Sequence, residues 1–404
     1  MKRLTGLKKE LAFVNNAKNK EFKKLPFKIL WYLHSTFKNE KLTQINGRYV
    51  INTFMPPFPS TAFEQLIKNT VSVYNHNVFP YSAYAAVTAR CGFNCWHCSK
   101  AYRHGEELST DKWIQIMRRL QDIGISVIGF TGGEPLLMHG LEDIINSIDE
   151  RSTTILFTSG DGLTDQRAKS LKGAGLFYIA VSLDHYDEGK HNKLRGSDKA
   201  FSTALEAIDN SLKNGFYTAV QITVTTDILN NEDMNKYIEF VNKLGVEEIR
   251  IVEPMPTGRL IKEGADVFLN ESEHEFINRY HIATNKNKRL PKIASFTFLE
   301  NEALYGCGAG IQHIYIDPFG NLCPCDFTPL SFGNINEEGF DIPYQRLRSQ
   351  FNRPRDKCFI LDNMGKISPL FEKNLPLGYE ESLAVCSNCT KGRLPEFYKK
   401  LGWE

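Results

Sequence analysis

The chain runs Ser82-Ala-Tyr-Ala-Ala-Val-Thr88-Ala-Arg-Cys91-Gly-Phe-Asn-Cys95-Trp-His-Cys98 without interruption. Its first part, residues 82–88, is a short apolar run with β-branched and aromatic members, which is typical of a buried strand. Cys91, Cys95 and Cys98 follow at once, so three thiols lie in the loop at the end of this strand. Three thiolates at this spacing can hold one face of a four-iron cluster and leave the fourth iron open.

Strands and helices alternate after this loop. The strands that we expect cover residues 82–88, 127–131, 154–158, 178–183, 219–225 and 248–252. Apolar residues recur every three or four positions in the helical runs between them, such as 111–123, 200–213 and 232–244. Left-handed C-terminal caps are expected at Gly124, Gly215 and Gly245. This alternation predicts the α/β class, with a parallel sheet and crossover helices curled into a full or partial barrel.

Two flanking regions depart from the alternation, which occupies residues 81–290. Residues 1–80 form an N-terminal extension that is basic and partly helical, with a hairpin predicted at Asn46-Gly47. Residues 291–404 contain six of the nine cysteines and many turn residues. They predict a small domain organised around metal.

The composition suits a globular enzyme with one large core, since 42% of the 404 residues are hydrophobic. No run approaches the roughly 20 apolar residues of a membrane-spanning helix, and the N-terminus lacks the pattern of a signal peptide. We therefore expect a cytoplasmic protein. The net charge of +2 gives no basis for nucleic acid as a partner.

Positive charge is concentrated at the N-terminus, where residues 1–28 carry nine lysines or arginines against two glutamates. Trp31, Tyr32 and several aliphatic residues follow on a short helical run. A basic amphipathic helix of this kind suits a peripheral membrane contact through residues 1–40. Packing of the same residues onto the barrel also explains them, and it is the interpretation that we favour.

The nine cysteines fall into two dense groups more than 200 residues apart, which in a reducing compartment indicates metal ligands rather than disulfides. Zinc is the alternative to iron at the first group, but a structural zinc site needs four protein ligands. No fourth cysteine or suitably spaced histidine pair stands nearby. His97 is expected to pack beside the site.

The CxxxCxxC pattern of Cys91, Cys95 and Cys98, with His97 before the last cysteine, resembles the motif of the radical S-adenosylmethionine (SAM) superfamily. The resemblance implies a partial (β/α)6 TIM-like barrel, a 4Fe-4S cluster on these catalytic cysteines, and SAM chelated at the open iron. It also implies an electron donor such as flavodoxin or ferredoxin, whose electron splits SAM into methionine and a 5′-deoxyadenosyl radical.

The end of the second strand, Thr131-Gly-Gly-Glu-Pro135, resembles the GGEP motif of the same family. Gly132, Gly133 and Glu134 are therefore expected to receive the amino group of SAM. Glycines let the backbone approach a ligand closely, and a glutamate accepts hydrogen bonds from an ammonium.

Two further positions are expected to contact SAM through the same resemblance. Ser182, at the end of the fourth strand, would meet the ribose or methionyl part. Pro256 would help to cradle adenine, in the turn Pro254-Met-Pro-Thr-Gly-Arg259. Ordinary solvated turns explain Ser182 and Arg259 equally well.

The second cysteine group, Cys307-x12-Gly320-x4-Cys325, resembles the opening of the SPASM or twitch extension, which binds auxiliary four-iron clusters. Residues 315–322 predict a hairpin that brings Cys307 and Cys325 together. With Cys386 and Cys389 they supply four ligands, enough for one auxiliary cluster.

The sequence departs from the full SPASM pattern, because no closely spaced cysteines follow Cys389. We therefore expect one auxiliary cluster rather than two. Cys323 could replace Cys325 as a ligand. Cys358 could complete a second site or donate hydrogen, although a buried, inert thiol is favoured for it. Zinc stays an alternative at this group.

Together these features predict an oxygen-sensitive enzyme that abstracts hydrogen from a substrate C–H bond. Peptide or protein modification is the leading expectation, since His191, Arg195-Gly196 and Phe201 match a pattern of the peptide-modifying branch. A tetrapyrrole, lipid or other small molecule is the alternative, because Pro254–Arg259 is also similar to a turn of haem-biosynthesis members. A non-catalytic iron-sulfur electron carrier or a zinc-stabilised binding protein is the alternative of another class.

Overall fold

The structure is a computed structural model that describes residues 1–16, 20–38 and 40–404. The strands of its central sheet are β4 (Ser82–Thr88), β5 (Val127–Gly132), β6 (Thr153–Thr158), β7 (Tyr178–Ser182), β8 (Tyr217–Thr223), β9 (Glu248–Val252), β10 (Lys292–Ser295), β11 (His313–Ile316) and β12 (Leu322–Cys323). They lie in the order β10-β9-β8-β7-β6-β5-β4-β11-β12. Neighbours from β10 to β11 are parallel, and β12 pairs with β11 antiparallel.

The six strands expected from the sequence are present, with ends that agree within about two residues. The sheet also extends further than expected, because β10 and β11 lie beyond residue 290. The alternation continues through α10 (Glu271–Lys286) into β10, whose four residues include the buried Lys292 and lack the apolar run of the other strands. The proposed division of the chain near residues 80 and 290 remains a prediction.

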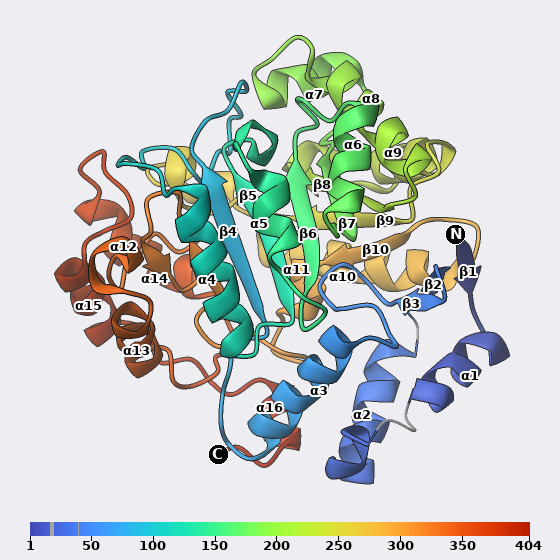
Figure 1. The fold of residues 1–404 in the computed structure, drawn as a ribbon, viewed down its shortest axis with the longest axis horizontal. Helices are drawn as coiled ribbons and strands as arrows, with labels where there is room; N and C mark the ends of the chain where they lie inside the picture. The colour runs from blue at the N-terminus through green and yellow to red at the C-terminus, as the bar shows by residue number, and fades with distance from the viewer. Residues whose placement is uncertain (17–19, 39) are drawn as a thin grey trace.

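Helices cover the outer face of the sheet (Figure 1). α4 illustrates why they form and where they stop. Ser109 accepts a hydrogen bond from the backbone of Lys112 at its start, and Trp113 packs in the core. Gly124 follows its end with a φ of +92°, as predicted. The covering helices are α4 (Thr110–Asp122), α5 (Leu141–Asn146), α6 (Asp165–Gly173), α7 (Glu188–Arg195), α8 (Ala200–Lys213) and α9 (Asn231–Lys243).

The N-terminal extension forms a small antiparallel sheet, β1-β2-β3, and three helices. Asn46 and Gly47 have φ angles of +48° and +77°, so the predicted hairpin is confirmed. The helices lie below the lower ends of the parallel strands, in blue in Figure 1. These elements are β1 (Lys2–Leu4), β2 (Leu42–Ile45), β3 (Arg48–Val50), α1 (Leu7–Asn16), α2 (Phe27–Phe37) and α3 (Thr61–Tyr74).

Buried charges join the extension to the lower end of the barrel. Glu248 of β9 is fully buried and accepts a hydrogen bond from the backbone nitrogen of Thr53 at 3.0 Å. Lys292 of β10 donates to the carbonyl oxygens of Val50 and Ile51, both at 2.9 Å. Polar groups at the barrel's lower end therefore find their partners in the extension, which closes that end.

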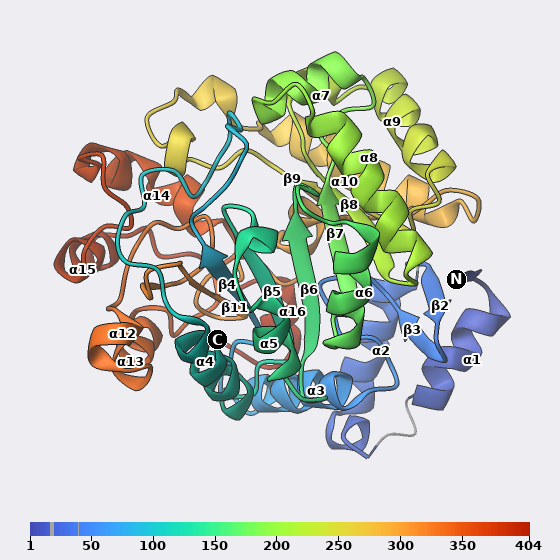
Figure 2. The same cartoon turned by 45° about the horizontal axis from the view of Figure 1, so that its top comes forward.

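The last part of the sequence lies beside the β11–β12 edge of the sheet, in orange and red in Figures 1 and 2. The predicted hairpin is confirmed, since β11 and β12 pair across a turn in which Gly320 has a φ of +94°. No helix in the described ranges is long and apolar enough to span a bilayer. The remaining helices are α11 (Phe296–Leu299), α12 (Ile335–Glu338), α13 (Asp341–Gln350), α14 (Phe359–Ile367), α15 (Tyr379–Ser387) and α16 (Glu396–Lys400).

Removing the buried carboxylate of Glu248 should weaken the contact between the N-terminal extension and the barrel. Glu248→Ala leaves Thr53 and the Tyr217 hydroxyl, which donates to Glu248 at 2.9 Å, without an acceptor. We expect a loss of about 3–5 kcal/mol in the free energy of unfolding, measured by urea denaturation. The control Glu239→Ala, on the exposed side of α9, should change it by less than about 0.5 kcal/mol. Equal stability of the two variants would contradict this role for Glu248.

Candidate functional site

The loop after β4 places the first three cysteines at the C-terminal end of the parallel strands, toward the top of Figure 1. Cys91 is exposed, and Cys95 and Cys98 are partly buried. Partial burial, with smaller contributions from the charges of Glu134, Cys95 and Cys98, raises the pKa of Cys91 to about 11. The three thiols are thus within electrostatic reach of one another, and sulfur donors from one loop suit an iron-sulfur cluster.

No group of three or more His, Cys, Asp or Glu side chains within residues 1–16, 20–38 and 40–404 is arranged to hold a single metal ion.

The first contact that holds the loop comes from the end of β5. The backbone nitrogens of Gly133 and Glu134 donate to the carbonyl oxygens of Thr88 and Arg90, both at 2.7 Å. A Cβ atom on Gly133 would lie 2.2 Å from the Arg90 oxygen, which is closer than atoms can approach. Gly132 is equally confined, with a Cβ atom 2.3 Å from the Thr88 oxygen. These expected SAM-binding glycines therefore also fix the backbone that enters the cysteine loop.

Glu134, the third residue expected to bind SAM at this strand end, is buried and fully engaged by other parts of the protein. Its carboxylate accepts hydrogen bonds from the Thr158 hydroxyl at 2.7 Å and from the Ser159 nitrogen and hydroxyl at 2.8 and 2.6 Å. It also accepts from the backbone of Leu136 at 3.1 Å. Burial raises its pKa above the ordinary value. Glu134 thus ties the end of β6 to the end of β5, and an ammonium of SAM would compete with these donors.

The second contact comes from the end of α7. The backbone nitrogens of Asn94 and Trp96 donate to the carbonyl oxygens of Arg195 and Leu194, at 3.1 and 3.2 Å. Gly196 follows with a φ of +62°, and a Cβ atom there would lie 2.4 Å from the Asn94 oxygen. The middle of the cysteine loop is therefore fixed by a turn that only glycine fits.

Arg195 also places a positive charge beside the thiols. Its guanidinium nitrogen Nη1 lies 3.9 Å from the Cys95 sulfur. Asp184, which follows β7, holds the guanidinium with contacts of 2.6 and 2.8 Å. The carboxylate in turn accepts from the backbone of Thr223 at 2.9 Å. The sequence placed Arg195 in a family pattern, but its contact with Cys95 depends on the packing of α7 and was not foreseen.

The third contact comes from the turn after β9. The backbone nitrogen of Arg259 donates to the Cys98 carbonyl at 3.1 Å. Gly258 has a φ of +55°, and a Cβ atom there would lie 2.1 Å from the Cys98 oxygen. The Arg259 guanidinium also donates to the Asn94 side chain. We call these three sets of contacts, from Gly133/Glu134, Leu194/Arg195 and Gly258/Arg259, the backbone clamp.

The remaining predicted SAM contacts lie at neighbouring strand ends. Pro256 is buried directly before Thr257, whose buried hydroxyl has no partner in the part of the sequence that the structure describes. Ser182 is partly buried where β7 ends. His97 is partly buried, with Nε2 at 3.3 Å from the Thr223 hydroxyl, and burial lowers its pKa to about 4. A free hydroxyl beside the clamp suits a polar ligand such as the ribose or adenine of SAM.

The second cysteine group is only partly as expected. The neighbouring Cys358 thiol lowers the pKa of Cys307, and the charges of Cys307 and Cys325 act on Cys358. All three line a cavity of about 460 Å³ that reaches Met255, next to Pro256. Cys358, which sequence spacing left unassigned, thus joins the predicted pair Cys307 and Cys325. It stands at the start of α14, and no motif spacing relates it to the other two.

The other predicted auxiliary ligands lie at the end of α15, where the backbone nitrogen of Cys389 donates to the Cys386 carbonyl oxygen at 3.2 Å. Arg355 connects Cys386 with Cys307. Its carbonyl accepts from the Cys307 nitrogen at 2.9 Å, and its charge acts on both Cys307 and Cys386. Arg355 therefore lies close to both Cys307 and Cys386.

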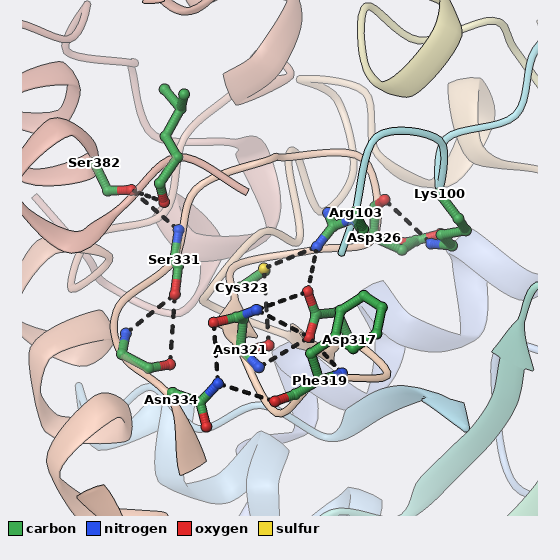
Figure 3. Close-up of polar contacts among 12 residues, drawn as sticks. Lys100, Arg103, Asp317, Phe319, Asn321, Cys323, Asp326, Ser331, Asn334 and Ser382 are labelled. Carbon is green, nitrogen blue, oxygen red and sulfur yellow. Dashed lines mark hydrogen bonds and ion pairs between the residues drawn. The ribbon is translucent and has the colours of Figure 1, made fainter. Parts of the chain in front are cut away.

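Cys323 lies beside Arg103 (Figure 3). Arg103 binds the Asp317 carboxylate at 3.0 Å and places Nη1 at 3.7 Å from the Cys323 sulfur. Lys100, just after Cys98, donates to the Asp326 carbonyl at 3.3 Å. The hairpin next to Cys325 is thus connected directly to the cysteine loop. Cys323 contacts Arg103, which is part of this connection, rather than the other thiols.

Adding a methyl group to a glycine of the backbone clamp should prevent cluster binding without unfolding the protein. Gly133→Ala forces its Cβ atom into the Arg90 carbonyl and displaces the loop. After anaerobic reconstitution we expect iron bound per protein molecule to fall by roughly the four irons of one cluster. Gly173→Ala, in α6 with open space around it, is the matched control and should keep the wild-type iron content. Wild-type iron in Gly133→Ala would show that the loop needs no such fit.

Comparison with known proteins agrees with this geometry. The AdoMet-dependent heme synthase of Methanosarcina barkeri is 26% identical over 280 residues, which cover 63% of this chain and 79% of that protein. Among solved structures, Streptococcus suis SuiB bound to its precursor peptide SuiA has a TM-score of 0.56 at 15% identity over 80% of each protein. Native anSMEcpe with AdoMet and a peptide bound has a TM-score of 0.52 at 17% identity, over 67% of this chain and 80% of that one.

Two family models match the sequence where the two cysteine groups lie. Residues 86–244 match the radical SAM superfamily, and residues 307–360 match the iron-sulfur cluster-binding SPASM domain. These matches confirm the predicted fold class, the enzymatic nature of the protein, and 4Fe-4S clusters with SAM as its cofactors. The protein is a member of the radical SAM superfamily, in its SPASM-containing branch.

Proposed function

We propose that Cys91, Cys95 and Cys98 are the three cluster ligands, and that this enzyme abstracts hydrogen from a substrate C–H bond in the cavity beside Met255. A cluster of this kind supplies an electron that cleaves SAM to methionine and a 5′-deoxyadenosyl radical. Cleaving SAM without a fixed cluster would release the radical away from substrate. The residues of the protein therefore have to hold the loop, place SAM and shield the site.

The observation that carries this proposal is the backbone clamp. Glycines at 133, 196 and 258 let three strand or helix ends reach the carbonyl oxygens of the loop. A loop fixed in this way presents its sulfurs in one arrangement, so the protein supplies geometry before any ligand arrives. Arg195 adds a cation next to Cys95, which stabilises the thiolate that ligation requires.

We place SAM along the ends of β5, β7 and β9. The amino acid part would meet Gly132, Gly133 and Glu134. Ser182 would contact the ribose or methionyl part, and Pro256 would lie against adenine. The Thr257 hydroxyl, which has no partner among the described residues, supports a polar ligand at this last position.

For the auxiliary cluster we propose Cys307, Cys325 and Cys358 as ligands, with a fourth from Cys386 or Cys389. The contact between Cys307 and Cys358 supports this set. The four ligands expected from the sequence, Cys307, Cys325, Cys386 and Cys389, are the alternative. In either set the cluster borders the cavity and suits an electron relay near the substrate.

The substrate proposed from the family resemblance is a peptide, since SuiB and anSMEcpe have peptides bound. A small molecule is the second candidate, since the heme synthase is a relative with a different product. Flavodoxin or ferredoxin is the proposed electron donor, and the cytoplasm, which keeps thiols reduced, is the proposed compartment.

SAM cleavage tests the catalytic part of the proposal. The reconstituted enzyme with SAM and dithionite should form 5′-deoxyadenosine, and Cys95→Ala should form none above background. Cys323→Ala is the matched control, because this thiol contacts Arg103 rather than the cysteine loop, and it should retain product formation. Product formation by Cys95→Ala at the wild-type rate would refute the assignment.

Iron analysis distinguishes the two auxiliary ligand sets. In the Cys91/Cys95/Cys98→Ala background, roughly four irons per protein molecule should remain in the auxiliary cluster. Adding Cys358→Ala should remove most of them, and adding Cys323→Ala should not. If Cys358→Ala keeps all of the iron, Cys358 is not a ligand and the set with both Cys386 and Cys389 holds.

A further inference from the structure

A second cavity, of about 450 Å³, lies between the N-terminal helices, α16 and the lower end of the barrel. Its size falls within the range of roughly 300–1,000 Å³ that small ligands occupy. The walls are almost entirely apolar, and they include Phe37, Ile51, Phe63 and Ile67. The proposed site does not use this space. A cavity of this kind fits a hydrocarbon tail better than a peptide backbone, whose polar groups would find few partners there.

The rim of this cavity is formed by large apolar side chains that are exposed to solvent. Phe27 and Trp31, one turn apart on α2, are 79% and 62% exposed, and Val14 on α1 is 59% exposed. Leu7 and Leu11 precede Val14 on the same face of α1 and are 77% and 51% exposed. Soluble proteins rarely expose such a patch unless it docks against another apolar phase. We call these five residues the apolar rim.

Positive charge surrounds the apolar rim. The glutamates of this region are paired, Glu10 with His34 at 2.7 Å and Glu21 with Lys24 at 2.7 Å. Exposed lysines in the described part of this segment include Lys2, Lys8, Lys20, Lys23 and Lys28. Apolar side chains flanked by exposed lysines are the composition of helices that lie in the surface of an anionic bilayer.

The second cavity leads toward the auxiliary cysteines. Tyr81 and Gln312 line both this cavity and the one that contains Cys307, Cys325 and Cys358. Burial raises the pKa of Tyr81, so its hydroxyl stays neutral. A hydrocarbon tail that occupies the second cavity therefore ends at an uncharged boundary with the proposed reaction cavity.

From these observations we infer that α1 and α2 dock this enzyme on an anionic phospholipid bilayer, and that the second cavity receives the hydrocarbon tail of a lipid substrate. The inference rests on the proposed function for the reaction itself, in which one hydrogen atom passes from a C–H bond of the lipid to the 5′ carbon of the adenosyl radical. The proposed docking surface does not depend on the proposed function, because it is argued from the exposed residues of α1 and α2. The inference deepens the second candidate of the proposed function, a small molecule, by naming a lipid as the substrate class.

Vesicle sedimentation tests the docking surface with the full-length protein. Vesicles of phosphatidylcholine with about 30% phosphatidylglycerol should pellet the wild type, and high salt should weaken this binding. Phe27→Glu/Trp31→Glu should bind about tenfold more weakly, because charge replaces the apolar rim. The matched control Ile342→Glu, at a 48% exposed position on α13, should bind as the wild type does.

A wild type that stays in the supernatant overturns the inference, as it would if the rim served a protein or peptide partner instead. Equal binding of Phe27→Glu/Trp31→Glu and the wild type overturns it too.

Fluorescence quenching tests whether a lipid tail enters the cavity. A brominated fatty acid at a concentration where it is monomeric, with no vesicles present, should quench tryptophan emission in the wild type because Trp31 lines the cavity, and this quenching should be reduced by at least half in Trp31→Phe. Equal quenching in both proteins overturns the placement of the tail.

Cys95→Ala separates this inference from the proposed function. It should bind vesicles as the wild type does and yet form no 5′-deoxyadenosine. Vesicle binding and SAM cleavage can therefore fail independently of each other.

Discussion

The backbone clamp is the constraint on which the site depends. The carbonyl oxygens of the cysteine loop are approached so closely that a methyl group on Gly133, Gly196 or Gly258 would overlap them. Such contacts are available because β4, β5, β7 and β9 are parallel and their C-terminal ends lie at one edge of the sheet. The fold thus brings three separate segments to the short loop after β4, and the three thiols take their positions from these contacts.

The same loop also sets the relation between the two cysteine groups. Lys100 reaches the Asp326 carbonyl, and Arg103 binds Asp317 in the β11–β12 hairpin. Because β11 pairs with β4, the hairpin belongs to the central sheet and does not swing as a separate body. The extension closes the opposite end through Glu248 and Lys292. The cavity that contains Cys307, Cys325 and Cys358 is therefore enclosed by the sheet, the hairpin and the cysteine-rich region, with the apolar cavity beneath it.

Much of this arrangement could be predicted from short patterns. The spacing of apolar residues and the glycine caps located the six parallel strands and their helices. Asn46-Gly47 predicted a hairpin because both residues tolerate positive φ. The motif positions Gly132, Gly133 and Pro256 do lie near the cysteine loop. Cys358 was missed because its contact with Cys307 comes from packing alone. β10 was missed because a buried lysine interrupts its apolar pattern, and the burial of that lysine depends on carbonyls of the extension.

Hydrogen exchange of the metal-free protein shows whether the protein itself holds the cysteine loop before a cluster binds. Peptides covering residues 89–98 and 130–137, followed by mass spectrometry, report whether the clamp exists before any cluster binds. We expect slow exchange at Asn94, Trp96 and Glu134, whose nitrogens donate to backbone carbonyls within the clamp. Exchange at the rate of an unstructured loop would mean that the cluster, rather than the protein, arranges the three thiols. That result would contradict the role of the backbone clamp.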